Sequence, residues 1–266
     1  MELNAPPPWR CVDFISDLHL QASDAQTCEA WTQYLLNTTA DAVFILGDLF
    51  EVWVGDDVIS ETSTFEARCV HVIRQAAQKT RIFIMQGNRD FLMGPALMHA
   101  CNATLLDDPT VLVFGSQRWL LTHGDALCLA DIPYQAFRNM VRSESWQKVF
   151  LAKTLPERQA IARDIREQSE AHKRNKSIGN ESGYVDLDTA AVVQTLRAGH
   201  AKYMIHGHTH QPGLHLLDHG LERIVLSDWD AWAQPPRAEV LRIDIDSQGQ
   251  SAARRITPAT ATKRQD

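Results

Sequence analysis

Cysteine is scarce in this chain, and the five cysteines do not form a pattern. They are Cys11, Cys28, Cys69, Cys101 and Cys128, an odd number with wide spacing and no Cys-x-x-Cys pair. That spacing argues against a disulfide framework and against a structural zinc ribbon. We expect reduced thiols, as in a cytoplasmic protein.

The sequence also lacks long apolar runs and a basic excess. No run of about 18 apolar residues is present, so we expect no membrane span. Met1–Asn4 and the prolines Pro6–Pro8 have neither the basic end nor the apolar run of a signal peptide. The net charge of −7 argues against general nucleic-acid binding. With 266 residues, 44% hydrophobic and 22% charged, the chain can form one large α/β domain or two small ones.

One stretch, Ala42–Asp48, shows the pattern that organises the chain. Five apolar residues run into Gly47 and then into a single carboxylate, Asp48. Such a run predicts a buried strand, and the glycine allows a sharp turn at its end. Asp48 then lies at the carboxyl end of a strand, where open α/β folds bind ligands. Taken alone, Asp48 is better explained as the cap of the next turn.

The same pattern recurs at five strand ends. Strands predicted at 11–16, 42–46, 81–85, 118–122 and 202–206 end in Asp17-x-His19, Gly47-Asp48, Gly87-Asn88, His123 and His208-x-His210. Between them, helical spacing is found at 24–37, 64–79 and 185–198, and further strands are predicted near 110–114, 222–227 and 238–245. Strands alternating with helices favour a layered α/β core. We expect 1–9 to be disordered, 51–63 to be a loop with a solvated turn at Asp56-Asp57, and 247–266 to be a loose polar tail.

The residues at these ends are suited to metal binding. They comprise two Asp, one Asn and four His, which are oxygen and imidazole donors without a thiolate. This mixture favours Mn²⁺, Fe or Zn²⁺ over Ca²⁺ or a cysteine-bound structural Zn²⁺. Seven side chains are too many for one six-coordinate ion that also holds water. Two ions that share one carboxylate fit the count and suit phosphoryl displacement.

Each motif is weak by itself, and a single buried histidine such as His123 is more often a satisfied core residue. Together and in this order, D-x-H, GD, GN, H and GHTH resemble the calcineurin-like metallophosphoesterase superfamily over about residues 11–245. Most members follow GN with a histidine, whereas this chain has Gly87-Asn88-Arg89-Asp90. That variant, with the segments 47–57, 87–92, 123–128 and 205–210, is similar to the UDP-2,3-diacylglucosamine diphosphatase branch, which acts in lipid A biosynthesis.

The resemblance implies a β-sandwich core flanked by helices, a helical cap, two Mn²⁺ ions and a set of site residues. It implies Asp17, His19, Asp48 and His210 at one ion, and Asp48, Asn88, His123 and His208 at the other, with Asp48 bridging. It implies catalytic roles for Asn88, Arg89 and His123. It implies substrate contacts from Asn88, Arg89, Asp131, Ser169, Lys173, Lys176 and His208.

The segment 132–180 differs from the rest of the chain because its spacing is helical throughout. Between 131 and 180, ten basic residues exceed six acidic ones, so this part is locally +4. We divide the chain into a core (1–131 and 181–246), a helical insertion (132–180) and a tail (247–266). By spacing alone, the insertion is a helix pair that covers the sheet. The resemblance favours an acyl-chain pocket with peripheral contact to an anionic membrane.

The function that the resemblance implies is attack of water on the α-phosphorus of UDP-2,3-diacylglucosamine, giving UMP and 2,3-diacylglucosamine 1-phosphate. The expected location is the cytoplasmic side of the bacterial inner membrane, with no obligate protein partner. Two alternatives remain open: another metallophosphoesterase that acts on nucleotide phosphodiesters or polyphosphates, and a non-catalytic scaffold that has lost its metals. The scaffold would lack ligands, and none of the seven is missing.

Overall fold

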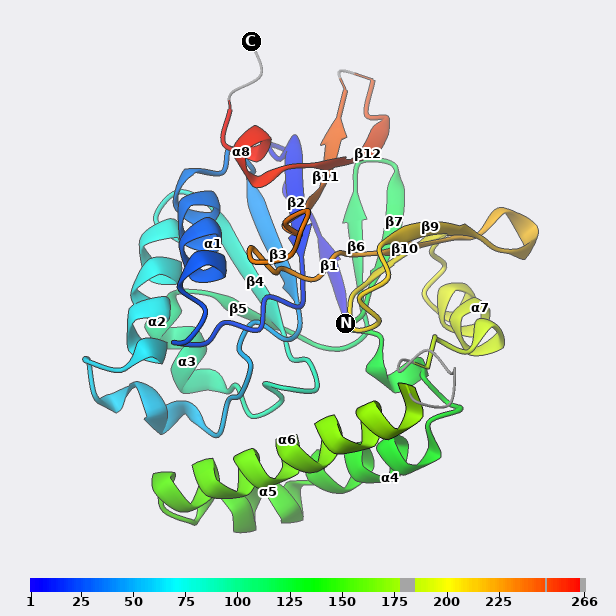
Figure 1. Ribbon diagram of the computed structural model, residues 1–266. Helices are drawn as coiled ribbons and strands as arrows, with labels where there is room; N and C mark the ends of the chain where they lie inside the picture. Colours follow the sequence, from blue (N-terminus) through cyan, green and yellow to red (C-terminus); the bar gives the residue numbers. More distant parts are fainter. Residues whose placement is uncertain (178–184, 247, 264–266) are drawn as a thin grey trace.

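Two six-stranded sheets packed face to face form the centre of the protein (Figure 1). The computed structural model describes residues 1–177, 185–246 and 248–263, with side chains for all of these except 168–177. One sheet has the order β1-β6-β7-β8-β10-β9 and the other the order β12-β11-β2-β3-β4-β5. The strands are β1 Glu2–Asn4, β2 Cys11–Ile15, β3 Ala42–Leu46, β4 Arg81–Met85, β5 Thr104–Leu106, β6 Thr110–Phe114, β7 Gln117–Leu121, β8 Tyr203–His206, β9 Gly213–Leu216, β10 Glu222–Val225, β11 Val240–Ile245 and β12 Ser251–Ile256.

Strand β3 shows why its residues are apolar without alternation. Its side chains point to opposite faces in turn, and both faces of its sheet are covered. Ala42, Phe44 and Leu46 pack in the core between the two sheets. Val43 and Ile45 pack on the other face, against the helices. The predicted layered α/β sandwich is thus confirmed.

Helices cover the outer faces of both sheets. Helices α1, α2 and α3 lie on the β2–β5 side, and α7 packs on β7 and β8 through Val192 and Leu196. Asp24, Thr64 and Asp188 cap α1, α2 and α7 through their side-chain oxygens. The helices are α1 Ala25–Asn37, α2 Phe65–Ala76, α3 Pro95–Cys101, α4 Ile132–Val141, α5 Glu144–Leu151, α6 Leu155–Ser177, α7 Thr189–Ala198 and α8 Pro258–Ala261. Among the described residues, no helix is both long and apolar enough to cross a bilayer.

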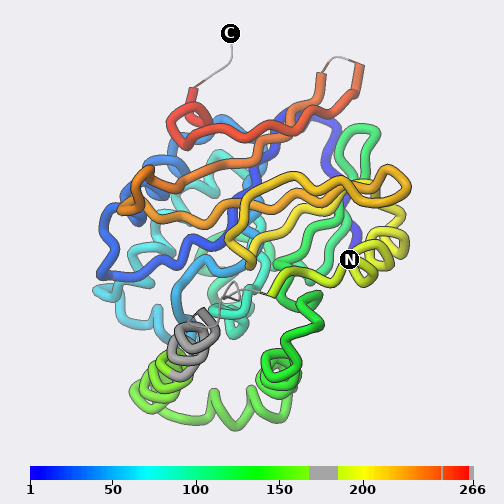
Figure 2. The backbone as a smooth tube through the Cα atoms, turned by 45° about the vertical axis from the view of Figure 1, so that its right-hand side comes forward, coloured from blue at the N-terminus to red at the C-terminus, as the bar shows by residue number. Residues whose placement is uncertain are grey.

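Helices α4, α5 and α6 occupy the segment that the sequence marked as helical. They lie together on one side of the molecule, opposite α8, in both views (Figures 1 and 2). Trp146 of α5 stacks on Phe150, with ring centroids 4.6 Å apart, and lies 6.1 Å from Phe91 of the core. Arg158 of α6 is 2% exposed and contacts Val54 O and Asp57. The division into core, insertion and tail remains a prediction.

Several expectations about the termini and loops were wrong. Residues 2–4 form β1, which pairs in parallel with β6, so the start of the chain is ordered. Residues 251–256 form β12, paired antiparallel with β11 over its whole length, so this part of the expected tail is not loose. The expected loop at 51–63 contains a 3₁₀ helix, Asp56–Ser60. Its Asp56 is not a solvated turn residue, because the carboxylate accepts bonds from the backbone of Gly94 and Leu97.

Candidate metal centre and active site

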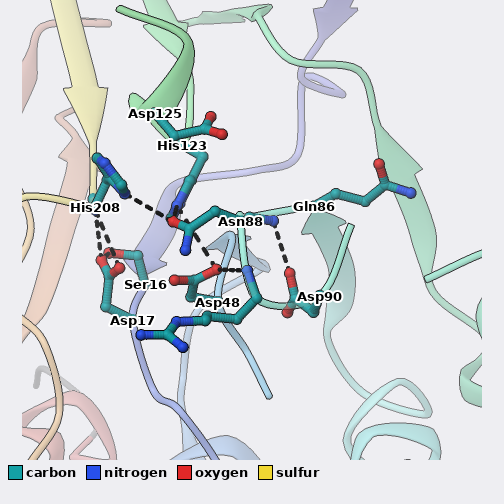
Figure 3. Close-up of polar contacts among 12 residues, drawn as sticks. Ser16, Asp17, Asp48, Gln86, Asn88, Asp90, His123, Asp125 and His208 are labelled. Atoms are coloured by element: carbon teal, nitrogen blue, oxygen red, sulfur yellow. Dashed lines mark hydrogen bonds and ion pairs between the residues drawn. The ribbon is translucent and has the colours of Figure 1, made fainter. Parts of the chain in front are cut away.

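The ligand-type residues meet because the strands that carry them run in parallel. Strands β2, β3 and β4 are parallel neighbours in one sheet, and β7 and β8 are parallel neighbours in the other. Their carboxyl ends therefore lie at the same edge of the sandwich. A bond from His208 N to Asp17 Oδ2 (3.0 Å) joins the two sheets at this edge (Figure 3).

Five of the seven predicted ligands have a backbone conformation that L-residues rarely adopt. The φ angles are positive at Asp17 (52°), His19 (47°), Asp48 (50°), His208 (67°) and His210 (53°). Non-glycine residues in this region are uncommon and are concentrated at functional sites. At the strand ends, this conformation turns the chain so that residues one apart both face the site.

Two glycines of the motifs are required by close approach. A Cβ on Gly87 would overlap Asp48 Oδ1, and a Cβ on Gly207 would overlap Asp17 Oδ2. Because each glycine has no side chain, a carboxylate from the end of another strand can occupy the space beside it.

The first group of ligand atoms comes from Asp17, His19 and His210. One donor atom from each lies within 4.8 Å of the other two. The Nε2 atoms of the two histidines are 3.3 Å apart, and His210 Nε2 is 3.4 Å from Asp17 Oδ1. Asp48 adjoins this group, with its Oδ2 3.8 Å from His19 Nε2.

The second group lies on the other side of Asp48. Asp48 Oδ1 is 3.8 Å from His123 Nε2, so the two oxygens of Asp48 face different histidines. Asn88 Oδ1 is 3.0 Å from His123 Nε2 and 2.8 Å from His208 Nδ1 (Figure 3). Asp17 is also within reach of Asp48 and His123, so both carboxylates lie between the two groups.

The surroundings of His123 test whether these residues fit a cation. Its Nδ1 is 2.9 Å from the carbonyl oxygen of Leu46, which only accepts, so Nδ1 carries a hydrogen. In the neutral ring, the lone pair of Nε2 then faces the oxygens of Asn88 and Asp48. The lone pair of Nε2 and the lone pairs of these oxygens repel one another. A cation between the atoms, or a proton on Nε2, removes this repulsion. The donor set thus fits a metal pair.

The pKa values of the two histidines in the second group move in opposite directions. Burial opposes the charged ring, but Asp48 and Asp17 outweigh it and raise the pKa of His123 to about 9. Burial, together with the charge of His123, lowers the pKa of His208 to about 4, so His208 is a neutral ligand-type imidazole at pH 7. The pKa of Asp17 lies below its usual range. Burial works to raise it, but the hydrogen bond with His210 and the charges of the histidines outweigh burial.

Arg89 lies beside the metal centre, next to Asp48. Its backbone N–H donates to Asp48 Oδ1 at 2.8 Å, and its guanidinium is 3.5 Å from Glu51. The fully buried Asp90 accepts backbone bonds from Gly87, Leu49 and Phe50. Asp90 therefore ties the loop after β4 to the loop after β3.

Two acidic residues behind the predicted ligands were missed by the sequence reasoning. Glu51 Oε2 is 2.9 Å from His19 Nδ1, and Asp228 Oδ2 is 3.7 Å from His210 Nδ1. Each carboxylate is also paired with arginine: Glu51 with Arg89 and Arg166, and Asp228 with Arg237. Glu51 follows the Gly47-Asp48 motif by three residues, which is the only hint in the sequence. No pattern marks Asp228.

A pocket of about 370 Å³ opens over this centre. Of the predicted substrate-binding residues, Asn88, Arg89 and His208 line it. Asp131 is partly buried at the start of α4, where it accepts from Tyr134 N. The side chains of Ser169, Lys173 and Lys176 lie outside the described residues. The lining is formed by Leu18, His19, Gln21, Asp24, Asp48, Glu51, Asn88, Arg89, Arg166, His208, His210, Asp228, Trp229, Asp230 and Arg237.

Helix α4 contacts the centre from the side of His208. Asp125 is buried and accepts from Tyr134 Oη at 2.6 Å and from Arg138 Nε at 2.7 Å. Arg142 donates to the carbonyl oxygen of Gly87 at 2.9 Å. Burial works to raise the pKa of Asp125, but His123 and the two arginines keep it well below its usual range. The first helix of the predicted insertion is thus fixed to the metal-centre loops by charged hydrogen bonds.

Comparison with known proteins places this geometry in a family. The sequence model described as calcineurin-like phosphoesterase matches residues 12–212, which include all seven predicted ligands. The chain belongs to the calcineurin-like phosphoesterase family. The family member described here is 43% identical to a UDP-2,3-diacylglucosamine hydrolase of Bordetella pertussis, over 87% of this chain and 90% of that protein. It is 45% identical to a protein of the same name from Chromobacterium violaceum, over 82% of this chain and 90% of that one.

Proposed function

We propose that this protein hydrolyses UDP-2,3-diacylglucosamine to UMP and 2,3-diacylglucosamine 1-phosphate, a step of lipid A synthesis. The observation that carries the proposal is the convergence of seven ligand-type residues with Arg89 directly beside Asp48. The relatives with 43% and 45% identity carry the name of this activity. Together they favour this reaction over other phosphoester substrates.

We propose that the centre holds two Mn²⁺ ions. Asp17, His19, Asp48 and His210 would hold one, and Asp48, Asn88, His123 and His208 the other. The placement of one Asp48 oxygen toward His19 and one toward His123 supports a bridging role. When bound, two such cations lower the pKa of water towards neutrality and polarise phosphoryl oxygens, so the chain need not supply a strong base.

The side chains around the centre have separate tasks in this proposal. Arg89 presents a fork of donors that stays protonated, which suits the phosphate oxygens and the charge they gain in the transition state. His123 holds its hydrogen on Nδ1 against Leu46, so its Nε2 faces the centre. Asn88 and neutral His208 lie beside it and also line the pocket. Asp131, Ser169, Lys173 and Lys176 are proposed as further substrate contacts.

We also propose that α4 and α5 contact an anionic membrane surface, at the cytoplasmic face of the inner membrane. Leu129, Ile132, Met140, Val149 and Leu151 are 44–73% exposed, although all are large and apolar. Basic residues outnumber acidic ones in this part of the chain. Apolar side chains with nearby positive charge are typical of peripheral membrane binding.

Vesicle binding tests the membrane proposal. Val149→Glu places a charge on the exposed face of α5, and we expect it to weaken sedimentation with vesicles rich in phosphatidylglycerol. Leu214→Glu on β9, where Leu214 is 58% exposed, is the matched control and should bind as the unchanged protein does. Equal binding of all three proteins would contradict the proposal.

The reaction is tested by UMP release from UDP-2,3-diacylglucosamine with added Mn²⁺ and after chelation. We expect release that depends on the metal and is restored when Mn²⁺ is returned. Dinucleotide polyphosphates and cyclic AMP should be measured beside it. Faster turnover of either one, or no UMP release under any condition, would overturn the assignment in favour of another phosphoesterase activity or a scaffold.

A further inference from the structure

Glu51 lies outside the predicted set of site residues, yet it contacts His19, Arg89 and Arg166. Its residue exposure is 8%, and its backbone N–H donates to Leu20 O in the loop after β2. The backbone at Glu51 is therefore fixed to the loop after β2. The side chain projects between the metal centre, Arg89 and helix α6.

The two carboxylate oxygens of Glu51 have different partners. Oε2 lies 2.9 Å from His19 Nδ1, on the far side of the ring from the metal centre. Oε1 lies 3.1 Å from Arg166 Nε of α6 and 3.5 Å from Arg89 Nη1. One oxygen thus contacts a predicted metal ligand, and the other contacts two arginine side chains that line the pocket.

We propose that Glu51 is a positioning residue that acts as a shared anchor, orienting His19 for the metal and holding Arg89 and Arg166 for the substrate. This proposal rests on the proposed function. A carboxylate behind a ligating histidine fixes the hydrogen on the remote nitrogen and turns the other nitrogen to the ion. Glu51 Oε2 and His19 Nδ1 form an ion pair at 2.9 Å that lies outside hydrogen-bond geometry. On the other side of the ring, His19 Nε2 lies 3.8 Å from Asp48 Oδ2 and 3.3 Å from His210 Nε2, at the centre.

The shared role explains why an amide is a poor replacement. Glutamine has one acceptor atom and one donor group. If its oxygen faces His19, its NH₂ group faces the donors of Arg89 and Arg166. If its oxygen faces the arginines, its NH₂ group forces the hydrogen of His19 onto Nε2, which then cannot bind a metal. Only a carboxylate accepts on both sides.

The first test is metal binding without substrate. We expect Glu51→Gln to lower the affinity of one of two Mn²⁺ ions by about 10–100-fold, measured from the EPR signal of free Mn²⁺. Glu61→Gln, an exposed glutamate of the same segment, is the control and should bind as the unchanged protein does. Wild-type affinity at both ions in a folded Glu51→Gln protein would overturn the proposal. If that variant fails to fold, Glu51→Asp makes the same test, because its shorter side chain cannot span both sets of partners.

The second test separates the two roles of Glu51. At saturating Mn²⁺ the ion is restored, and we expect KM in Glu51→Gln to remain several-fold raised because the two arginines have lost their acceptor. Arg166→Ala should raise KM while leaving Mn²⁺ affinity unchanged, and Arg163→Ala, an exposed arginine of the same helix, should change neither. A normal KM in Glu51→Gln would overturn the shared anchor. Absence of UMP release by the unchanged protein would defeat the proposed function alone, since metal binding is measured without substrate.

Discussion

Asp90 offers the sharpest test of how the loops of the metal centre are held. It is fully buried and accepts three backbone bonds: Gly87 N at 2.7 Å on Oδ1, and Leu49 N at 2.7 Å and Phe50 N at 3.3 Å on Oδ2. Burial and the charge of Asp48 raise the pKa of Asp90 to about 7, so the carboxylate form is tested above about pH 8. There Asp90→Asn keeps the size of the side chain but exchanges one acceptor for a donor. In its better orientation, the amide oxygen still accepts the hydrogen bonds from Leu49 N and Phe50 N. The NH₂ group then faces the N–H of Gly87, which loses its acceptor.

The expected loss follows from this count. One buried N–H left without an acceptor costs about 1–3 kcal/mol, so Asp90→Asn should lower the free energy of unfolding by that amount. Asp90→Ala leaves three such groups, and we expect a loss of about 3–5 kcal/mol. Both variants should also lower kcat, because the loops they loosen carry Asp48 and Asn88.

The assay is urea unfolding in the presence of a chelator, so that metal binding does not contribute to the measured stability. Asp164→Asn, at an exposed position of α6, is the control and should stay within about 0.5 kcal/mol of the unchanged protein. An Asp90→Asn protein as stable as this control would refute the argument that Asp90 joins the two loops.

Three further outcomes are expected. Asp48→Ala should abolish UMP release and weaken Mn²⁺ binding at both ions while the protein stays folded by circular dichroism; one intact ion would contradict the bridging role. Gly207→Ala should lower kcat/KM at least about tenfold, since the new Cβ would displace Asp17; unchanged kinetics would show that the loop adapts. Arg242→Met should destabilise the fold by about 3–5 kcal/mol, because Arg242 and Asp13 form a buried pair with N–O distances of 2.7 and 2.9 Å; denaturation at the unchanged urea midpoint would contradict this.

The ligand set could be predicted from the sequence because it depends on local signals. Each ligand follows an apolar run such as 42–46 or 81–85, and parallel neighbours bring the ends of such runs together. The ordered ends of the chain had no such signal. β1 has only three residues, and β12 contains serine and two arginines in place of an apolar run. Each is a strand because a partner, β6 or β11, offers its edge. Non-local pairing of this kind overrides local propensity.

The second layer of the site was hidden for a related reason. Glu51 and Asp228 are 32 and 18 residues from the histidines they contact, and the contacts arise from the way loops fold back over the sheet edge. Asp90 follows Arg89 in the Gly87-Asn88-Arg89-Asp90 motif, and nothing in the sequence marks its partners. Its burial among backbone N–H groups makes it the acceptor for two loops.

The left-handed backbone conformation of several predicted metal ligands connects the fold to the chemistry. Asp17, Asp48 and His208 adopt positive φ angles, a conformation that is unfavourable for residues with a side chain. Such residues persist only where the surroundings hold them, and here parallel pairing continues past the strands, from Asp17 N to Gly47 O and from Gly207 N to His123 O. The backbone hydrogen bonds of the sheets thus hold the loop residues in their unfavourable conformations. The ligands then need little rearrangement on binding a cation, which is the preorganisation that electrostatic catalysis requires.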